Sequence, residues 1–208
     1  MSVLISALLM GGSVGLVAGL SPGPLMSMVI SQTLRHNRRE GVKIALAPLF
    51  SDLPIILLTL FAASILTPSL LGIVSLVGSG YLLYIAYGTY KTVPLEMTTE
   101  PQAPPSSLRA GVVVNILSPH PYLFWSTVGA PYLVNTHSQS ALAAWGFVLT
   151  FYTLLIGAKV AVALVVGRYG ANLNPTHYLR VMHLLALSLV LFALMLIMDA
   201  IPLLMPLQ

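Results

Sequence analysis

Charged side chains are scarce in this chain of 208 residues, where nine Lys or Arg and five Asp or Glu make up 7% of the sequence. A soluble domain typically has about 25% charged residues. So few charges cannot cover a water-facing surface, and 57% of the residues are hydrophobic. The sequence therefore predicts an integral membrane protein whose outer surface is covered mainly by the bilayer.

Cysteine is absent, which excludes disulfides, thiolate metal sites and thiol chemistry. The sequence also lacks a phosphate-binding loop, a heptad run and a pair of catalytic carboxylates, and its five His residues have no metal-ligand spacing. We therefore expect no catalytic residue, no cofactor and no bound metal. The net charge of +4 is small, and we interpret it as a signal of membrane topology rather than of nucleic-acid binding.

Long apolar stretches are the main feature that the sequence does contain. A membrane-spanning helix needs about 20 apolar residues, and the stretches that meet this need span 3–33, 44–65, 69–90, 110–134, 140–167 and 181–204. No basic residue precedes the first stretch and no clear cleavage site follows it, so we interpret it as a retained span rather than a signal peptide. The predicted fold class is an all-α membrane protein with six transmembrane helices.

Basic residues are concentrated in alternate connections between these stretches. Eight of the nine Lys and Arg residues lie in the segments 34–43, 91–109 and 168–180. Because short cytoplasmic loops retain Lys and Arg, these three segments are predicted to be cytoplasmic. Both termini should then lie outside, in a multi-pass protein of the plasma (inner) membrane.

Two similar tetrapeptides occupy corresponding positions in the two halves of the chain, Ser21-Pro22-Gly23-Pro24 and Ser118-Pro119-His120-Pro121. Proline breaks a helix because it lacks a backbone donor and clashes with the preceding turn. We expect a three-helix repeat over 1–90, a linker over 91–109 and a second three-helix repeat over 110–208. Since each half has an odd number of spans, the halves should be inverted repeats with broken first helices.

The two predicted breaks are also the predicted solute site. A broken helix exposes N–H groups that attract a carboxylate and C=O groups that attract an ammonium, and an amino acid carries both. Gly23 would let a ligand approach the backbone closely. The alternative is that these prolines only shape the bundle. The predicted substrate-binding residues are Ser21, Pro22, Gly23, Pro24, Asn115, Ser118, Pro119 and His120.

Two ionisable residues lie deep within predicted spans. Asp52 follows Lys43 by nine residues and Lys159 precedes Arg168 by nine, so at 1.5 Å per residue both lie about 13 Å from a cytoplasmic helix end. A charge at such a depth is costly and is a functional candidate. We predict that Asp52 and Lys159 couple transport to an ion: the two charges could neutralise each other, or Asp52 could take up and release protons. The alternative is a static ion pair that fixes helix packing.

The first part of the chain resembles a known family. Gly15–Pro24 reads GLVAGLSPGP, Leu34–Gly41 reads LRHNRREG, and a second span with Asp52 follows. This pattern resembles the LysE-type amino-acid exporters, which include the homoserine and threonine exporters. The resemblance implies export of amino acids or similar metabolites, driven by the proton gradient.

The chain departs from the family pattern at the proposed site. Leu25 stands where the family commonly has Asn after S-P-G-P, and Ser51-Asp52 stands where it often has Gly-Asp. The Asn-Pro-Lys that the family often has in its fourth span corresponds here to Ser118-Pro119-His120.

The leading hypothesis is a secondary transporter that exports a small amino acid or similar zwitterionic metabolite, with the proton gradient as its energy source. One alternative is a membrane-embedded enzyme that acts on a lipid-like substrate through Asp52 and His120, and another is a membrane scaffold that transports nothing. The expected partners are a small-molecule solute and membrane lipids, without nucleic acid, and a homo-oligomer is compatible with this hypothesis. The residues alone leave open the solute, the coupling ion and the direction of transport.

Overall fold

A computed structural model describes residues 3–61, 67–91, 106–170 and 174–205, and these residues contain helices and no strand. The helices are α1 (Val3–Leu20), α2 (Pro24–Arg35), α3 (Arg38–Ala45), α4 (Ala47–Phe61), α5 (Pro68–Tyr90), α6 (Ser107–Ile116), α7 (Pro119–Phe124), the π-helical turn η3 (Trp125–Gly129), α8 (Ala130–Gln139), α9 (Ala141–Tyr169) and α10 (Pro175–Leu204). The all-helical fold class is therefore confirmed.

Local capping explains where the long helices begin. Pro68 and Pro175 stand in the first turns of α5 and α10, where the missing N–H is not needed and the fixed φ suits a helix. The side chains of Thr67, Ser140 and Asn174 each accept a hydrogen bond from a backbone N–H of the helix that follows. Such caps satisfy donors that would otherwise be unpaired.

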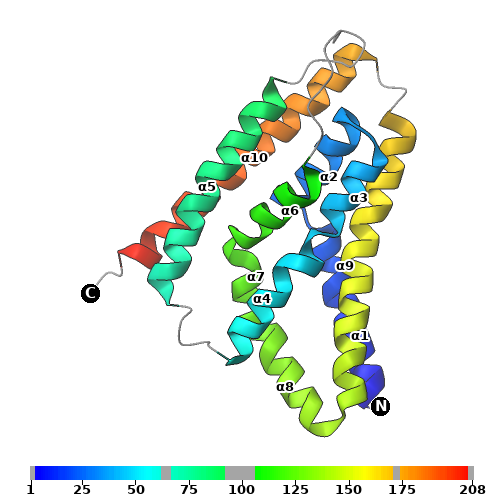
Figure 1. Cartoon of the computed structure of the whole chain (residues 1–208), viewed down its shortest axis with the longest axis vertical. Coiled ribbons are helices and arrows are strands. Elements are labelled where there is room, and N and C mark those ends of the chain that lie inside the picture. The colour runs from blue at the N-terminus through cyan, green and yellow to red at the C-terminus, as the bar shows by residue number, and fades with distance from the viewer. Residues whose placement is uncertain (1–2, 62–66, 92–105, 171–173, 206–208) are drawn as a thin grey trace.

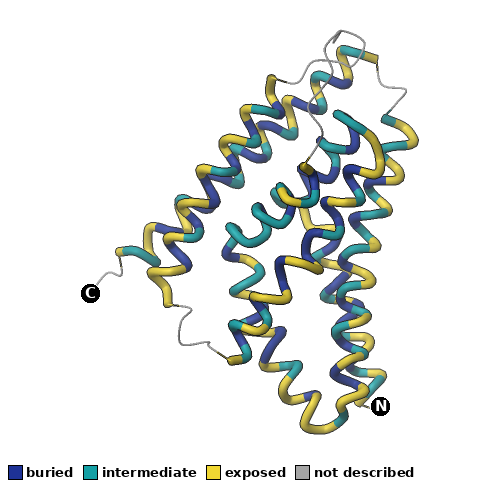
Figure 2. The backbone as a smooth tube through the Cα atoms, viewed as in Figure 1, coloured by how far each residue is buried: buried dark blue, intermediate teal, exposed yellow. Residues whose placement is uncertain are grey.

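Five helical segments of the described chain are long and apolar enough to cross a membrane: α1, the segment Arg38–Phe61 that joins α3 and α4, α5, α9 and α10. The remaining predicted span is divided among α6, α7, η3 and α8. Many large apolar side chains are exposed, and Figure 2 marks exposed residues along each long helix. A bilayer would remove this apolar surface from water.

The long helices associate in pairs. α1 packs along α9, α5 packs along α10, and α6 to α8 contact α4 (Figure 1). Gly11, Gly15 and Gly19 form the face of α1 towards α9, and a Cβ at Gly19 would lie 2.8 Å from the Leu155 carbonyl oxygen. Small residues at this spacing let two backbones approach closely. The last turn of α1 is thereby held against the middle of α9.

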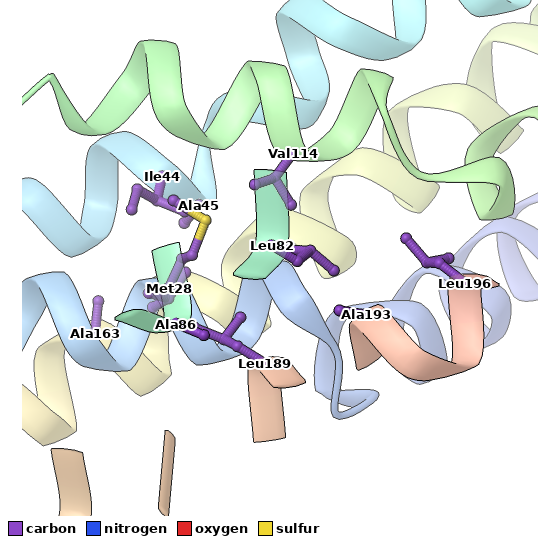
Figure 3. Packing of buried hydrophobic residues seen from close by; sticks show 11 residues of the cluster. Met28, Ile44, Ala45, Leu82, Ala86, Val114, Ala163, Leu189, Ala193 and Leu196 are labelled. Carbon is purple, nitrogen blue, oxygen red and sulfur yellow. The ribbon is translucent and has the colours of Figure 1, made fainter. Parts of the chain in front are cut away.

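The α5–α10 pair extends away from the other helices and joins them through an apolar cluster (Figures 1 and 3). Met28 from α2, Ile44 from α3, Leu82 from α5 and Leu189 from α10 belong to this cluster, and each is at most 2% exposed. Side chains far apart in the sequence thus meet in one core.

The structure corrects several predicted boundaries. The segment 34–43, predicted as a loop, is mostly helical, because α2 continues to Arg35 and Asn37 caps a new helix by accepting from the N–H groups of Arg39 and Glu40. Most of the predicted linker, residues 92–105, lies outside the described residues, as do 62–66 at the end of the second predicted span and 171–173 of the third predicted loop. Residues 107–109, at the end of the predicted linker, form the first turn of α6 instead.

Candidate functional site

The first helix break lies where Ser21-Pro22-Gly23-Pro24 predicts it. α1 ends at Leu20, and both the N–H and the Oγ of Ser21 donate to the Val17 carbonyl, at 2.9 and 2.7 Å. Gly23 is extended, with φ of −178°, and Pro24 begins α2. No side chain caps the start of α2, so its first turn keeps free backbone donors.

The second break lies where Ser118-Pro119-His120-Pro121 predicts it. α6 ends at Ile116, the Ser118 N–H donates to the Asn115 carbonyl at 3.3 Å, and Pro119 begins α7. α7 is followed at once by the π-helical turn η3. A π-helical turn inside a helix often occurs at a functional site, and nothing in the sequence had indicated one here.

A cavity of about 470 Å³ lies between the two breaks. It brings together most residues that the sequence singled out, although they come from α2, α4, α6, α7, α9 and the two breaks. Pro119 is the exception among them, since it is fully buried and does not line the cavity. The predicted residues that line the cavity are Ser21, Pro22, Gly23, Pro24, Asp52, Asn115, Ser118, His120 and Lys159.

Asp52 is 5% exposed and accepts hydrogen bonds from two other helices. The Asn115 Nδ2 donates to its Oδ1 at 2.6 Å and to the Ser51 Oγ at 2.7 Å, and the Tyr152 hydroxyl donates to its Oδ2 at 3.1 Å. Hydrogen bonds to a charged acceptor are stronger than those between neutral groups. The carboxylate is thus held in one orientation at the cavity wall.

Lys159 is also 5% exposed. Its Nζ donates to the carbonyl oxygens of Ala18 and Gly19, at 3.3 and 3.1 Å. These carbonyls belong to the last turn of α1, whose own hydrogen-bonding partners the break removes. The ammonium therefore lies on the negative end of the α1 helix dipole.

The structure contradicts a direct ion pair between Asp52 and Lys159. Among the described residues, Lys43 and Glu40 form an ion pair at 2.7 Å, whereas Asp52 and Lys159 do not come within 4 Å of each other. The physical reason is the close α1–α9 packing at Gly19, which offers Lys159 two carbonyl oxygens. The two charges line the same cavity but have separate partners.

Sequence reasoning missed Tyr152 and Trp125. Tyr152 precedes Lys159 by seven residues, two helical turns, and this spacing could have placed both on one face of α9. Trp125 is completely buried and lines the cavity. Its buried Nε1 interacts with the Asp52 carboxylate, so Trp125 belongs to the groups that surround this acid.

His120 is exposed, and its Nδ1 lies 3.1 Å from the Ser118 Oγ. The described residues contain no group of three His, Asp or Glu that could hold a metal ion. The site's chemistry therefore rests on one acid, one base, one imidazole and the backbone groups at two helix breaks.

These features define a helical membrane protein of the transporter class, in which discontinuous helices meet at a central cavity. The model of the LysE type translocator family matches residues 16–200, and the chain belongs to this family. The resemblance found from the residues is thereby confirmed, and membrane transport fits the expectation that the protein is not an enzyme. No curated protein and no solved structure gives a significant match.

Proposed function

We propose that the protein is a secondary transporter that exports a small amino acid or similar zwitterion across the plasma membrane, driven by the proton gradient. The observation that carries this proposal is the cavity, where one buried acid and one buried base lie at two broken helices. Membership of the LysE type translocators supports the same function.

The carboxylate of the solute would bind at the first break. There the Lys159 ammonium neutralises the last carbonyls of α1, and the uncapped first turn of α2 adds N–H donors and a positive dipole end. Gly23 leaves room for this approach, since a Cβ on it would meet no atom within 4 Å. The first break is therefore the cationic side of the cavity.

The ammonium of the solute would bind at the second break. The Asp52 carboxylate and the carbonyls at the end of α6 are acceptors there, and Asn115 orients the carboxylate. A proton and the solute ammonium would compete for Asp52. Solute bound from the cytoplasm would leave outside when a proton protonates Asp52, and that proton would be released inside, so export and proton entry are coupled one to one.

The inverted-repeat architecture and the topology belong to the same proposal. A pseudo-twofold relation between the halves would exchange the first span with the fourth and the second with the fifth. Contact of α1 with α9 would then correspond to contact of α4 with α6–α8, and α5 would pair with α10. Contacts between these same helices support the proposal. Cysteine labelling of His137→Cys tests the topology, since the chain has no Cys, and labelling from the cytoplasmic side alone would contradict it.

Purified protein in sealed proteoliposomes tests the function. An imposed proton gradient should drive accumulation of an unmodified amino acid from a mixed panel, and an uncoupler should abolish it. An enzyme would convert its substrate in detergent, where no gradient exists, and a scaffold would do neither. Absence of amino-acid movement under both gradient and exchange conditions would overturn the proposal.

A further inference from the structure

The cavity contains one acid and one base, and little else that is charged. Among the described residues that line it, Asp52 and Lys159 are the charged groups and His120 is the other titratable one. In the proposed transporter, the ammonium and the carboxylate of the solute occupy Asp52 and Lys159. No acid or permanently charged base then remains for a charged side chain.

Ser21, Asn115 and Ser118 add uncharged polar groups near the two breaks, and most of the other lining residues are apolar. Two groups of these apolar residues matter for the solute's side chain. The first group consists of three aromatic rings and one leucine, which we call the aromatic wall: Phe124, Trp125, Phe151 and Leu155. These residues belong to or pack against a buried apolar cluster. Phe124 stacks on Phe151 with ring centroids 5.2 Å apart. Such packed rings form a firm surface rather than an adaptable one.

The second group comes from α10, which contributes only apolar residues to the cavity: Phe192, Met195 and Leu196. Leu196 is buried within the same apolar cluster that joins α10 to the other helices (Figure 3). A hydroxyl, amide or charge directed at these side chains would lose its water without gaining a partner.

We propose that the solute is an amino acid with an uncharged, apolar side chain of leucine, methionine or phenylalanine type. Its side chain lies against the aromatic wall and α10, while its charged groups lie at the two breaks. This inference rests on the proposed function. Lysine and glutamate are rejected because the cavity has no third charge to pair with them, and serine because its hydroxyl meets an apolar wall.

Competition in proteoliposomes tests this specificity. Exchange of labelled leucine should be inhibited by leucine, methionine and phenylalanine at concentrations about tenfold or more below those of serine, lysine and glutamate, given the discrimination that apolar pockets achieve. Serine or lysine inhibiting as strongly as leucine would overturn the inference and leave the transport function standing. Failure of every amino acid to exchange would overturn both.

Two variants on α10 sharpen the test. Met195→Thr alters the cavity wall and should reduce the preference for leucine over serine. Met198→Thr is the matched control, since Met195 and Met198 are both exposed, at 56% and 69%, but only Met195 lines the cavity. The preference of this control should equal that of wild type. Equal preferences in all three proteins would contradict the role assigned to α10.

A binding measurement separates recognition from transport. The chain has two Trp residues, and Trp145 is 68% exposed and outside this cavity. Trp145→Phe therefore leaves Trp125 as a fluorescent reporter in the cavity wall. Leucine should change its emission in detergent at concentrations where serine and lysine do not, and an equal response to all three would overturn the inference.

Discussion

The two helix breaks have nearly the same tetrapeptide and opposite electrostatic surroundings. At the first, the Lys159 ammonium lies on the carbonyls of Ala18 and Gly19. At the second, the Asp52 carboxylate accepts from Asn115, just before the break. The tetrapeptide thus supplies the break, whereas a side chain from a neighbouring helix supplies the charge. In the proposed transporter, this division would let the same kind of helix break bind the carboxylate of the solute at one place and its ammonium at the other.

The breaks also differ in how firmly they are packed. Ser21 and Pro22 are exposed, and a Cβ on Gly23 would meet nothing within 4 Å. At the second break Pro119 is fully buried, and η3 places the buried Trp125 one turn further on. The first break is therefore open to a ligand, and the second is anchored in the bundle.

Asp52→Asn should have the largest effect, because it removes the acid of the second break. The variant should fold and lose gradient-driven accumulation while solute-for-solute exchange persists, since Asn keeps an acceptor oxygen. One charge moved across 100 mV is worth about 2.3 kcal/mol, or about a fiftyfold gradient. The accumulation ratio in proteoliposomes measures this loss. Asp199→Asn is the control, because Asp199 is exposed and outside the cavity, and it should accumulate solute like wild type.

Lys159→Met should have the next largest effect, because it removes the base of the first break. The KM for the solute should rise about tenfold to a hundredfold, as expected for a lost hydrogen bond to a charged group. Arg168→Met, an exposed change on the same helix, should leave KM unchanged. A normal KM in Lys159→Met would show that the solute carboxylate binds elsewhere.

Leucine analogues that lack one charged group test the two breaks separately. Leucinamide lacks the carboxylate, so it should compete equally well in wild type and in Lys159→Met. The anion 4-methylpentanoate lacks the ammonium, so its competition should survive in Asp52→Asn and fail in Lys159→Met. The reverse pattern would mean that the breaks bind the opposite groups.

Tyr152→Phe should have a smaller effect, because it removes one of the hydrogen bonds to Asp52 and leaves the ring in place. Coupled transport should fall about fivefold to tenfold, as a lost hydrogen bond of about 1 kcal/mol predicts, and its pH profile should move, whereas a purely structural role would change only the amount of folded protein. Tyr169→Phe, at the exposed end of the same helix, is the matched control.

A pair of glycine variants should have the smallest effect on transport and distinguishes packing from binding. Gly19→Ala places a Cβ 2.8 Å from the Leu155 carbonyl oxygen, so its thermal unfolding temperature should fall, with overpacking costing about 1–3 kcal/mol. Gly23→Ala has free space and should keep the unfolding temperature of wild type, with a modest rise in KM. Equal behaviour of the two variants would contradict an open first break.

Much of the site followed from local chemistry. The prolines at positions 22, 24 and 119 predicted both breaks, because a proline ring lacks the N–H that a helix interior needs and clashes with the preceding turn. Asp52 and Lys159 were evident because an ionisable residue inside an apolar stretch is costly to bury and is therefore a functional candidate. Tyr152 and Trp125 were missed because aromatic residues are common in membrane helices and only their contacts reveal a role.

The sequence by itself determined the helical membrane class, the family, the two breaks and the two buried charges, since each depends on composition or on a short stretch of chain. Only the tertiary structure decided that Lys159 lies on the α1 carbonyls and not on Asp52. It also decided that α10 lines the cavity with apolar side chains. Both depend on the distance between helices far apart in sequence, which is set by how closely small residues such as Gly19 let the backbones approach.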